Sequence, residues 1–224
     1  MRPIHRAPAR PGGEANDPKE KPMRKTLQEP SLIRMVRWAQ RLVAEVLEAG
    51  DLAIDLTAGN GTDTLFLARQ VGSEGRVFAF DVQLEALQHT GARLTEAGIA
   101  WILDGQGDAG TVRLVHDSHA RLTEYTQGPA RGIMANLGYL PGGDPGLTTR
   151  AEITLEALRQ ALDLLAIGGR MALVVYIGHP PGEEECRAVE EWLQGLSSRY
   201  WHILRLQVAN RRQAPYLLVV ERRG

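Results

Sequence analysis

Residues 53–83 constrain the fold more than any other part of the sequence. This stretch begins with a short apolar run that includes Asp55, continues through the small residues 57–61, and then shows apolar positions at helical spacing. A second apolar run follows and ends at Asp81, twenty positions after Gly61. The order predicts a strand, a glycine-rich turn, a helix and a second strand that ends in an acidic residue.

The chemistry of this unit predicts a site for a cofactor that contains a nucleoside. Glycines let a ligand approach the backbone closely, and the start of a helix offers N–H groups that have no partner within the helix. An acidic side chain at the end of the second strand can accept both hydroxyl groups of a ribose. The alternative is a tight turn between strand and helix, followed by a solvated Asp81.

Length and charge narrow the class of protein. A chain of 224 residues suits one α/β domain with a sizeable core. Its formal net charge of −1 means that any nucleic-acid-binding surface has to be local. The single cysteine, Cys186, excludes an internal disulfide and is typical of a cytoplasmic protein. No apolar run is long enough to span a bilayer, so we expect no membrane partner.

The first residues differ in composition from the rest of the chain. Residues 1–24 are rich in proline and charge and lack apolar periodicity, which predicts a disordered tail. They contain no apolar segment of a secretory signal, and Met23 is a second candidate start. We expect a single domain over residues 25–224.

Apolar runs alternate with helical periodicity along that domain, which predicts an α/β fold with a parallel sheet and right-handed crossovers. Helices are expected over residues 31–49, 62–71, 84–97, from Leu155 to the glycines 168–169, and over 183–196. Strands are expected over residues 53–56, 76–80, 112–115, 132–135, 171–177, 202–208 and 216–220. The last two strands follow one another directly, which predicts an antiparallel hairpin at the end of the sheet.

Two classes of cofactor fit the first turn: nicotinamide dinucleotides and S-adenosylmethionine (SAM). The dinucleotide fingerprint requires a third glycine where this chain has Thr64, and little chain remains for a substrate domain. The paired strands at the end and the spacing of Asp55, Gly59 and Gly61 resemble SAM-dependent methyltransferases. Thr57 stands where those enzymes usually have a further glycine.

A closer resemblance rests on five motifs that occur in a fixed order. They are Asn60-Gly61-Thr62-Asp63-Thr64, Phe80-Asp81-Val82-Gln83, Ser118-His119, the run from Asn136 to Asp144, and Val175-Tyr176-x-Gly178-His179-Pro180. With them the chain resembles a small family of bacterial and plastid methyltransferases, formerly labelled rRNA methylases. That family is now associated with methylating the 5-aminomethyl group of 2-thiouridine at the tRNA wobble position.

The resemblance covers residues 32–221, and residues 136–144 are its most specific part. It implies a Rossmann-like class I methyltransferase fold: a mostly parallel sheet of seven strands, a C-terminal antiparallel hairpin, and helices on both faces. It also implies SAM as the cofactor. Because ligands bind beyond the carboxyl ends of parallel strands, we expect Asp81 to bind the ribose, and Asp55 to orient the turn or the methionine amine. The full set expected to bind the cofactor is Asp55, Thr57, Gly59, Asn60, Gly61, Asp63, Asp81, Gln83, Ser118, His119 and Asn136.

Three residues are candidates for catalysis. Asn136 would face the accepting amine, Tyr139 would stack on the uracil, and His179 ranks first as proton acceptor, ahead of His119 and Tyr176. The alternatives are that Tyr139 only packs its loop and that the histidines are structural. An alkyl ammonium with a pKa of about 10 must lose a proton, which costs about 4 kcal/mol at pH 7. The sequence has no convincing metal-ligand spacing, so we expect a mechanism without a metal.

The expected substrate is tRNA, recognised at its anticodon loop. Five arginines form a candidate phosphate-binding patch: Arg34, Arg37, Arg41, Arg211 and Arg212. The alternative is that these side chains only form a solvated surface. A homodimer is an open option. The competing functions are a methyltransferase for rRNA or a small-molecule amine, a non-catalytic SAM-binding RNA module and, more remotely, a nicotinamide-dependent reductase.

Overall fold

The computed structural model describes residues 32–104, 111–138, 151–176, 180–211 and 214–224. The expected tail, residues 1–24, lies outside this part of the chain, as do Tyr139 and His179.

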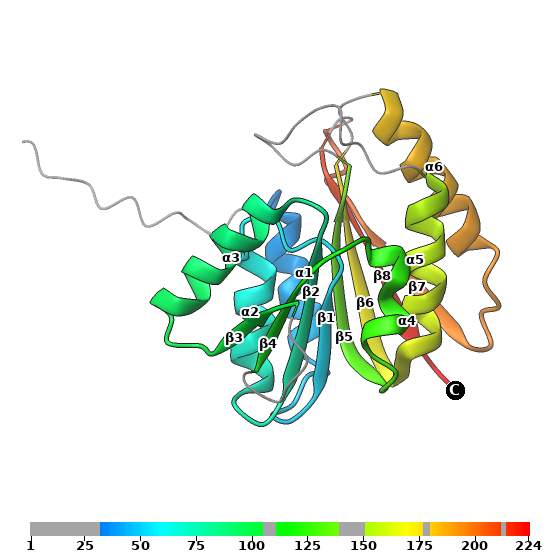
Figure 1. Cartoon of the computed structure of the whole chain (residues 1–224). Helices are drawn as coiled ribbons and strands as arrows, with labels where there is room; N and C mark the ends of the chain where they lie inside the picture. Colours follow the sequence, from blue (N-terminus) through cyan, green and yellow to red (C-terminus); the bar gives the residue numbers. More distant parts are fainter. Residues whose placement is uncertain (1–31, 105–110, 139–150, 177–179, 212–213) are drawn as a thin grey trace, which may run out of the picture. The chain divides into compact units, whose positions relative to one another are not determined.

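A single mixed sheet organises the described residues (Figure 1). Its eight strands are β1 (Leu52–Asp55), β2 (Arg76–Asp81), β3 (Trp101–Leu103), β4 (Val112–His116), β5 (Ala130–Leu137), β6 (Leu165–Val175), β7 (Trp201–Leu206) and β8 (Tyr216–Arg222). Their order in the sheet is β3-β4-β2-β1-β5-β6-β8-β7. The strands from β3 to β6 pair in parallel, and β8 is antiparallel to both β6 and β7.

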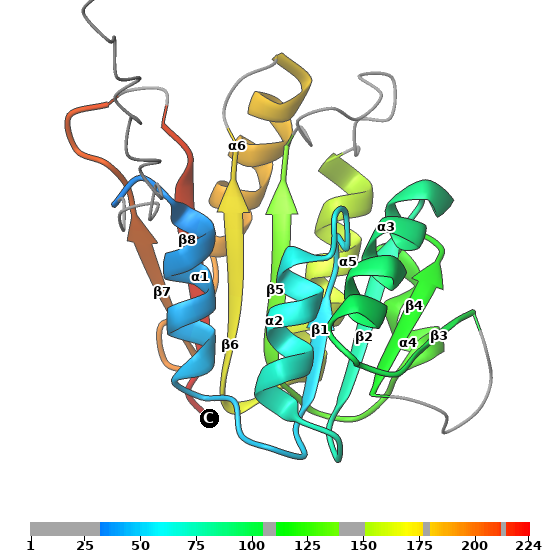
Figure 2. The same ribbon diagram turned by 90° about the vertical axis from the view of Figure 1, so that its left-hand side faces the viewer.

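Helices cover both faces of the sheet (Figure 2). On one face lie α1 (Met35–Ala44), α2 (Thr62–Val71) and α3 (Leu84–Glu96). On the other lie α5 (Ala151–Leu164) and α6 (Pro180–Gln194), together with the short η1 (His119–Arg121) and α4 (Leu122–Tyr125). Each layer of helices packs on its own apolar core. Among the described residues, none of the helices is both long and apolar enough to cross a membrane.

The central strands are buried on both sides because helices cover both faces. The last five residues of β6, from Met171 to Val175, are all buried, as expected for a continuous apolar run in a parallel sheet. The predicted fold class is therefore confirmed, including the antiparallel C-terminal strands. One short edge strand, β3, was not predicted, since it has only three residues.

Several predicted helix boundaries are wrong. Three helices begin at other residues than predicted: α1 at Met35, α5 at Ala151 and α6 at Pro180. The first helix ends at Ala44, because the chain turns before β1. The helix expected to reach the glycines 168–169 ends at Leu164, and β6 begins at the next residue. Those glycines lie inside the strand, where the pairing register with β5 shifts between Ala130 and Gly132. They therefore belong to an irregularity of the β-bulge type instead of a helix stop.

Candidate cofactor and methyl-transfer site

Asp81, the last residue of β2, holds the glycine turn in place. Its Oδ2 accepts the backbone N–H of Gly59 at 2.9 Å, and its Oδ1 accepts the backbone N–H of Gln83 at 2.9 Å. Each carboxylate oxygen has two lone pairs, so both oxygens can accept a further hydrogen bond. The same carboxylate can therefore order the turn and still accept ribose hydroxyls.

The turn also depends on close packing at Gly61. This residue has a φ of +76°, and a Cβ there would lie 2.9 Å from the Cα of Thr90 on α3. The hydroxyl of Thr90 donates to the carbonyl oxygen of Gly59 at 3.1 Å. Glycine is required at position 61 both for the left-handed backbone and for the approach of α3.

Asp55, at the end of β1, is completely buried. Its Oδ1 accepts the backbone N–H of Thr57 at 3.1 Å, and its Oδ2 accepts the hydroxyl of Thr64 at 2.6 Å. Burial, with the negative charge of Asp63 as the next cause, raises the pKa of Asp55 to about 7. Of the two roles expected for Asp55, the geometry fits orientation of the turn.

A second carboxylate, Asp63 in the first turn of α2, joins three elements. Its Oδ1 accepts the side-chain amide of Gln40 on α1 at 2.8 Å. Its Oδ2 accepts the side-chain amide of Asn136 on β5, also at 2.8 Å. The backbone N–H of Asn136 donates in turn to the hydroxyl of Thr57 at 2.8 Å. Asn136 is thus held at both its side chain and its backbone.

This network sets the chemical character of the site. Burial raises the pKa of Asp63, while the hydrogen bonds from Asn136 and Gln40 oppose the shift. Since Asp63 binds the amide nitrogen of Asn136, the amide carbonyl is the end that can accept a hydrogen bond from a substrate amine.

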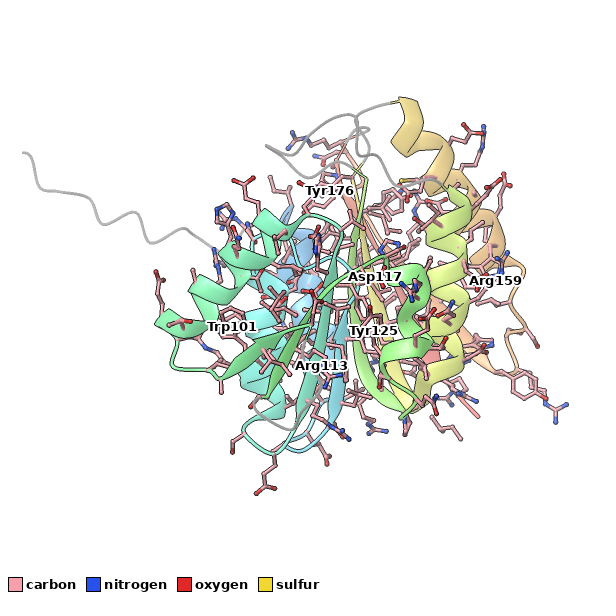
Figure 3. All side chains as sticks on the ribbon, in the orientation of Figure 1. Trp101, Arg113, Asp117, Tyr125, Arg159 and Tyr176 are labelled. Carbon is pink, nitrogen blue, oxygen red and sulfur yellow. The ribbon has the colours of Figure 1, made fainter. Side chains whose placement is uncertain are left out.

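Tyr176 follows β6 at the same edge of the sheet (Figure 3). Burial, and then the charge of Asp63, raise the pKa of its phenol. The side chain therefore stays protonated at neutral pH, which disfavours Tyr176 as a proton acceptor and suits it to donate a hydrogen bond. Gly138, with a φ of +92°, allows the close approach here, because a Cβ would lie 2.6 Å from the carbonyl oxygen of Tyr176.

His119 lies in η1, beyond the carboxyl end of β4. It is 8% exposed, and its Nε2 has no hydrogen-bond partner among the described residues. Burial lowers the pKa of the ring, opposed by the backbone of Leu56 and the charge of Asp81, so the imidazole is neutral at pH 7. A buried ring nitrogen without a partner needs an explanation, and a ligand bound beside Asp81 would supply one.

The remaining predicted cofactor residues support the local backbone. The Oδ1 of Asn60 accepts both the backbone N–H and the hydroxyl of Thr62, at 3.3 and 2.8 Å, at the start of α2. The hydroxyl of Ser118 accepts the backbone N–H of Ala120 at 3.2 Å at the start of η1. These contacts order the two loops that flank Asp81.

The segment after β4 is anchored by Asp117. Its Oδ2 accepts the hydroxyl of Tyr125 at 2.7 Å and pairs with Arg121 at 2.7 Å (Figure 3). The ring of Tyr125 meets Phe80 of β2 edge-on, with centroids 5.5 Å apart. These contacts hold the loop that carries Ser118 and His119 against the sheet.

Comparison with known proteins assigns the chain to a family. The family model described as "Putative rRNA methylase" matches residues 77–222. The chain belongs to this family. A putative rRNA methylase from Clostridium thermocellum is 35% identical, with a TM-score of 0.77, covering 84% of this chain and 97% of that one. A putative methyltransferase from Streptococcus mutans, solved with S-adenosylhomocysteine, is 32% identical, with a TM-score of 0.73 over 84% and 98% of the two chains.

A curated relative has a more specific name. A chloroplastic tRNA (mnm(5)s(2)U34)-methyltransferase of Arabidopsis thaliana is 38% identical in an alignment of 186 residues that covers 80% of this chain. The chain spans 66% of the length of that relative. The predicted family, the enzyme class of SAM-dependent methyltransferases and the cofactor class are confirmed by these matches.

The residues of this family member fit SAM at the edge formed by β1, β2, β4 and β5. The turn that would receive the cofactor contains Gly61, which packs closely against α3. Beside this turn lie Asp81 and the Nε2 of His119, which has no hydrogen-bond partner among the described residues. Hydrogen bonds join the candidates Asp55, Thr57, Asp63 and Asn136. A separate hydrogen bond joins Gly59 to Asp81, and the charge of Asp81 is close enough to raise the pKa of Asp55. The roles assigned to them remain predictions.

The sequence reasoning missed Gln40, Thr64 and Thr90. Thr64 lies one turn after the glycines, so its position at the start of a helix was a signal for it. Nothing local marks Gln40, because its partner is 23 positions away. Among the described residues, no cluster of three His, Cys, Asp or Glu side chains could hold a metal ion.

Proposed function

We propose that this protein transfers a methyl group from SAM to the 5-aminomethyl group of 2-thiouridine at the wobble position of tRNA. The observation that carries the proposal is the 38% identity to the Arabidopsis methyltransferase named for that nucleoside. The fixed orientation of the Asn136 side chain supports the proposal. Its carbonyl oxygen can accept a hydrogen bond from the substrate amine and so orient the lone pair of the nitrogen that receives the methyl group.

In this proposal the residues around the glycine turn hold the cofactor. Asp81 binds the ribose with the lone pairs that Gly59 and Gln83 leave over. His119 accepts a hydrogen bond on the adenosine side through Nε2, because its ring is neutral and its other nitrogen donates to the backbone of Leu56. Backbone N–H groups near Asn60 and Gly61 bind the methionine carboxylate. When bound, SAM supplies an electrophilic methyl group on a sulfonium centre.

Asn136 positions the substrate amine. The bond from its Nδ2 to Asp63 leaves Oδ1 to accept an N–H of the amine, so that the nitrogen lone pair can be aligned. Holding two reactants in line supplies most of the rate enhancement in a transfer of this kind. The ammonium form must first lose its proton, and His179, outside the described residues, stays the predicted acceptor. Tyr139 stays the predicted stacking partner of the base.

The direct test uses purified protein, labelled SAM and tRNA from a strain that lacks the final methyl group. After the tRNA is digested to nucleosides, we expect mass spectrometry to find the label in 5-methylaminomethyl-2-thiouridine. The same tRNA from a fully modified strain is the control and should take up no label. Because the family name refers to rRNA, unmethylated ribosomal RNA is a parallel substrate. Methylation of rRNA or of a free amine, with no methylation of the tRNA, would contradict the proposal.

A further inference from the structure

We propose that the outer face of α1 docks the phosphate backbone of the RNA substrate, with Arg37 and Arg41 as the contacting side chains. This proposal rests on the proposed function, since it takes RNA as the substrate.

The charge on α1 is entirely of one sign. Residues 32–44 include Arg34, Arg37 and Arg41 and no acidic residue. Arg37 and Arg41 are exposed. No carboxylate of the described chain lies within ion-pair distance of either side chain. By contrast, Arg121 and Arg170 each pair with two carboxylates and Arg205 pairs with one. In a chain with a net charge of −1, this is a local cationic surface of the kind that an RNA-binding protein needs.

This surface lies beside the candidate site. Gln40 is a neighbour of Arg41 in sequence and one turn from Arg37, and its amide reaches Asp63 at 2.8 Å. The same carboxylate binds Asn136. Figure 2 shows α1 alongside β6, with its N-terminal end at the edge where the parallel strands end. Phosphates on either side of a base inserted at Asn136 would therefore lie within reach of long side chains on α1.

An aromatic ring restrains one of the two arginines. The guanidinium of Arg41 lies 5.7 Å from the centroid of the Trp38 ring, which is half-buried. Stacking of this kind reduces the conformational freedom that Arg41 loses when it binds a phosphate. An aromatic ring next to arginine also suits a single-stranded loop, whose bases can stack on it. These contacts favour RNA over an anionic membrane, which would require an exposed apolar face on the same helix, whereas the apolar residues Met35, Ala39 and Val43 of α1 are buried in the core.

The test measures tRNA binding by the full chain with the double variant Arg37→Ala/Arg41→Ala. The matched control is Arg69→Ala/Arg76→Ala, which removes two exposed arginines from the end of α2 and the start of β2. The probe is a fluorescent unmodified tRNA transcript, and Kd is measured by anisotropy at several salt concentrations. Calorimetry with S-adenosylhomocysteine checks that each variant is folded and binds the cofactor product.

We expect the α1 variant to bind tRNA about tenfold more weakly at about 0.1 M salt, and the slope of log K against log salt to fall by roughly 1 to 2. The control variant and the affinity for S-adenosylhomocysteine should stay as in the wild type. A wild-type Kd and slope in the α1 variant, or an equal loss in the control, would overturn the proposal. So would a wild-type protein that binds phosphatidylglycerol vesicles through α1 and binds no tRNA. Binding of tRNA through α1 without methyl transfer would contradict only the proposed function.

Discussion

The side-chain amide of Asn136 donates to a buried carboxylate, that of Asp63, at 2.8 Å. This bond determines which end of the amide can meet a substrate, because a carboxylate accepts hydrogen bonds only and must face the NH₂ group. The other oxygen of Asp63 is held by Gln40 from a different helix. The orientation of Asn136 therefore depends on packing between α1, α2 and β5.

Replacing Asp63 tests that dependence. Asp63→Asn should lower kcat/KM by roughly 10- to 100-fold, because a hydrogen bond to a charged group contributes about 1.5–3 kcal/mol. Gln40→Ala should have a smaller effect in the same direction, since the bond between Asp63 and Asn136 remains. Steady-state kinetics with undermethylated tRNA would measure both, and an unaffected Asp63→Asn enzyme would show that the amide needs no anchor.

Asn136 should affect the turnover number and not the affinity for the cofactor. We expect Asn136→Ala to lower kcat by about 100-fold or more while calorimetry shows near-normal binding of S-adenosylhomocysteine. The variant removes the carbonyl that orients the amine but leaves the turn around Gly59 intact. Turnover close to that of the wild type would remove Asn136 from the catalytic residues.

Asp81 should be essential for the cofactor. Asp81→Ala removes the proposed ribose contact and leaves two backbone N–H groups without their acceptor, each at a cost of about 1–3 kcal/mol if buried. We expect calorimetry to detect no binding of S-adenosylhomocysteine, and the melting temperature to fall by several degrees. Asp81→Asn keeps one acceptor oxygen and should retain part of both properties. Normal cofactor affinity in the alanine variant would contradict the assignment.

The pKa of Asp55 links stability to pH. Its folded-state value of about 7 lies above its ordinary value of 3.8, so the folded state binds the proton more tightly than the unfolded state. The resulting stabilisation is complete below pH 3.8 and is lost as pH rises to about 7, by up to about 4 kcal/mol. Asp55→Asn removes this titration and keeps an acceptor for the N–H of Thr57.

Urea unfolding without cofactor, between pH 5 and pH 8, would measure this effect. The free energy of unfolding of the wild type should fall relative to that of Asp55→Asn by about 2–3 kcal/mol between pH 5 and pH 7, and then stay level. Parallel curves for the two proteins would mean that Asp55 ionises at its ordinary pKa.

Gly61→Ala should lower the free energy of unfolding more than the same substitution at Gly50, which also has a positive φ but has no close neighbours. Gly50 has a φ of +91°, and no atom lies within 4 Å of the place a Cβ would take, so Gly50→Ala should cost only about 1–2 kcal/mol for the left-handed conformation. Gly61→Ala adds a clash with the backbone of Thr90, which must move α3 away from the turn. We expect a larger loss in urea unfolding and weaker binding of S-adenosylhomocysteine. Equal losses for the two variants would mean that the contact with α3 is not tight.

The local pattern of the chain was enough to predict the strand–turn–helix–strand unit, the residues that end its strands, and the antiparallel strands at its end. Apolar periodicity and glycine-rich turns report on neighbours a few positions apart, and these elements are built from such neighbours. Helix α2 was predicted with the same first and last residues, Thr62 and Val71, that the structure has.

Packing of distant segments decided the rest. Gln40 lies 23 positions from Asp63, Asn136 lies 73 from Asp63, and Thr57 lies 79 from Asn136, yet one set of hydrogen bonds joins them. No periodicity encodes such bonds, because they form only when α1, α2 and β5 pack at one edge of the sheet. For the same reason the glycines 168–169 look like a helix stop in sequence, while strand pairing with β5 makes them part of β6. The local sequence restricts the backbone conformations that a segment can adopt, and tertiary contacts determine which of these conformations it adopts.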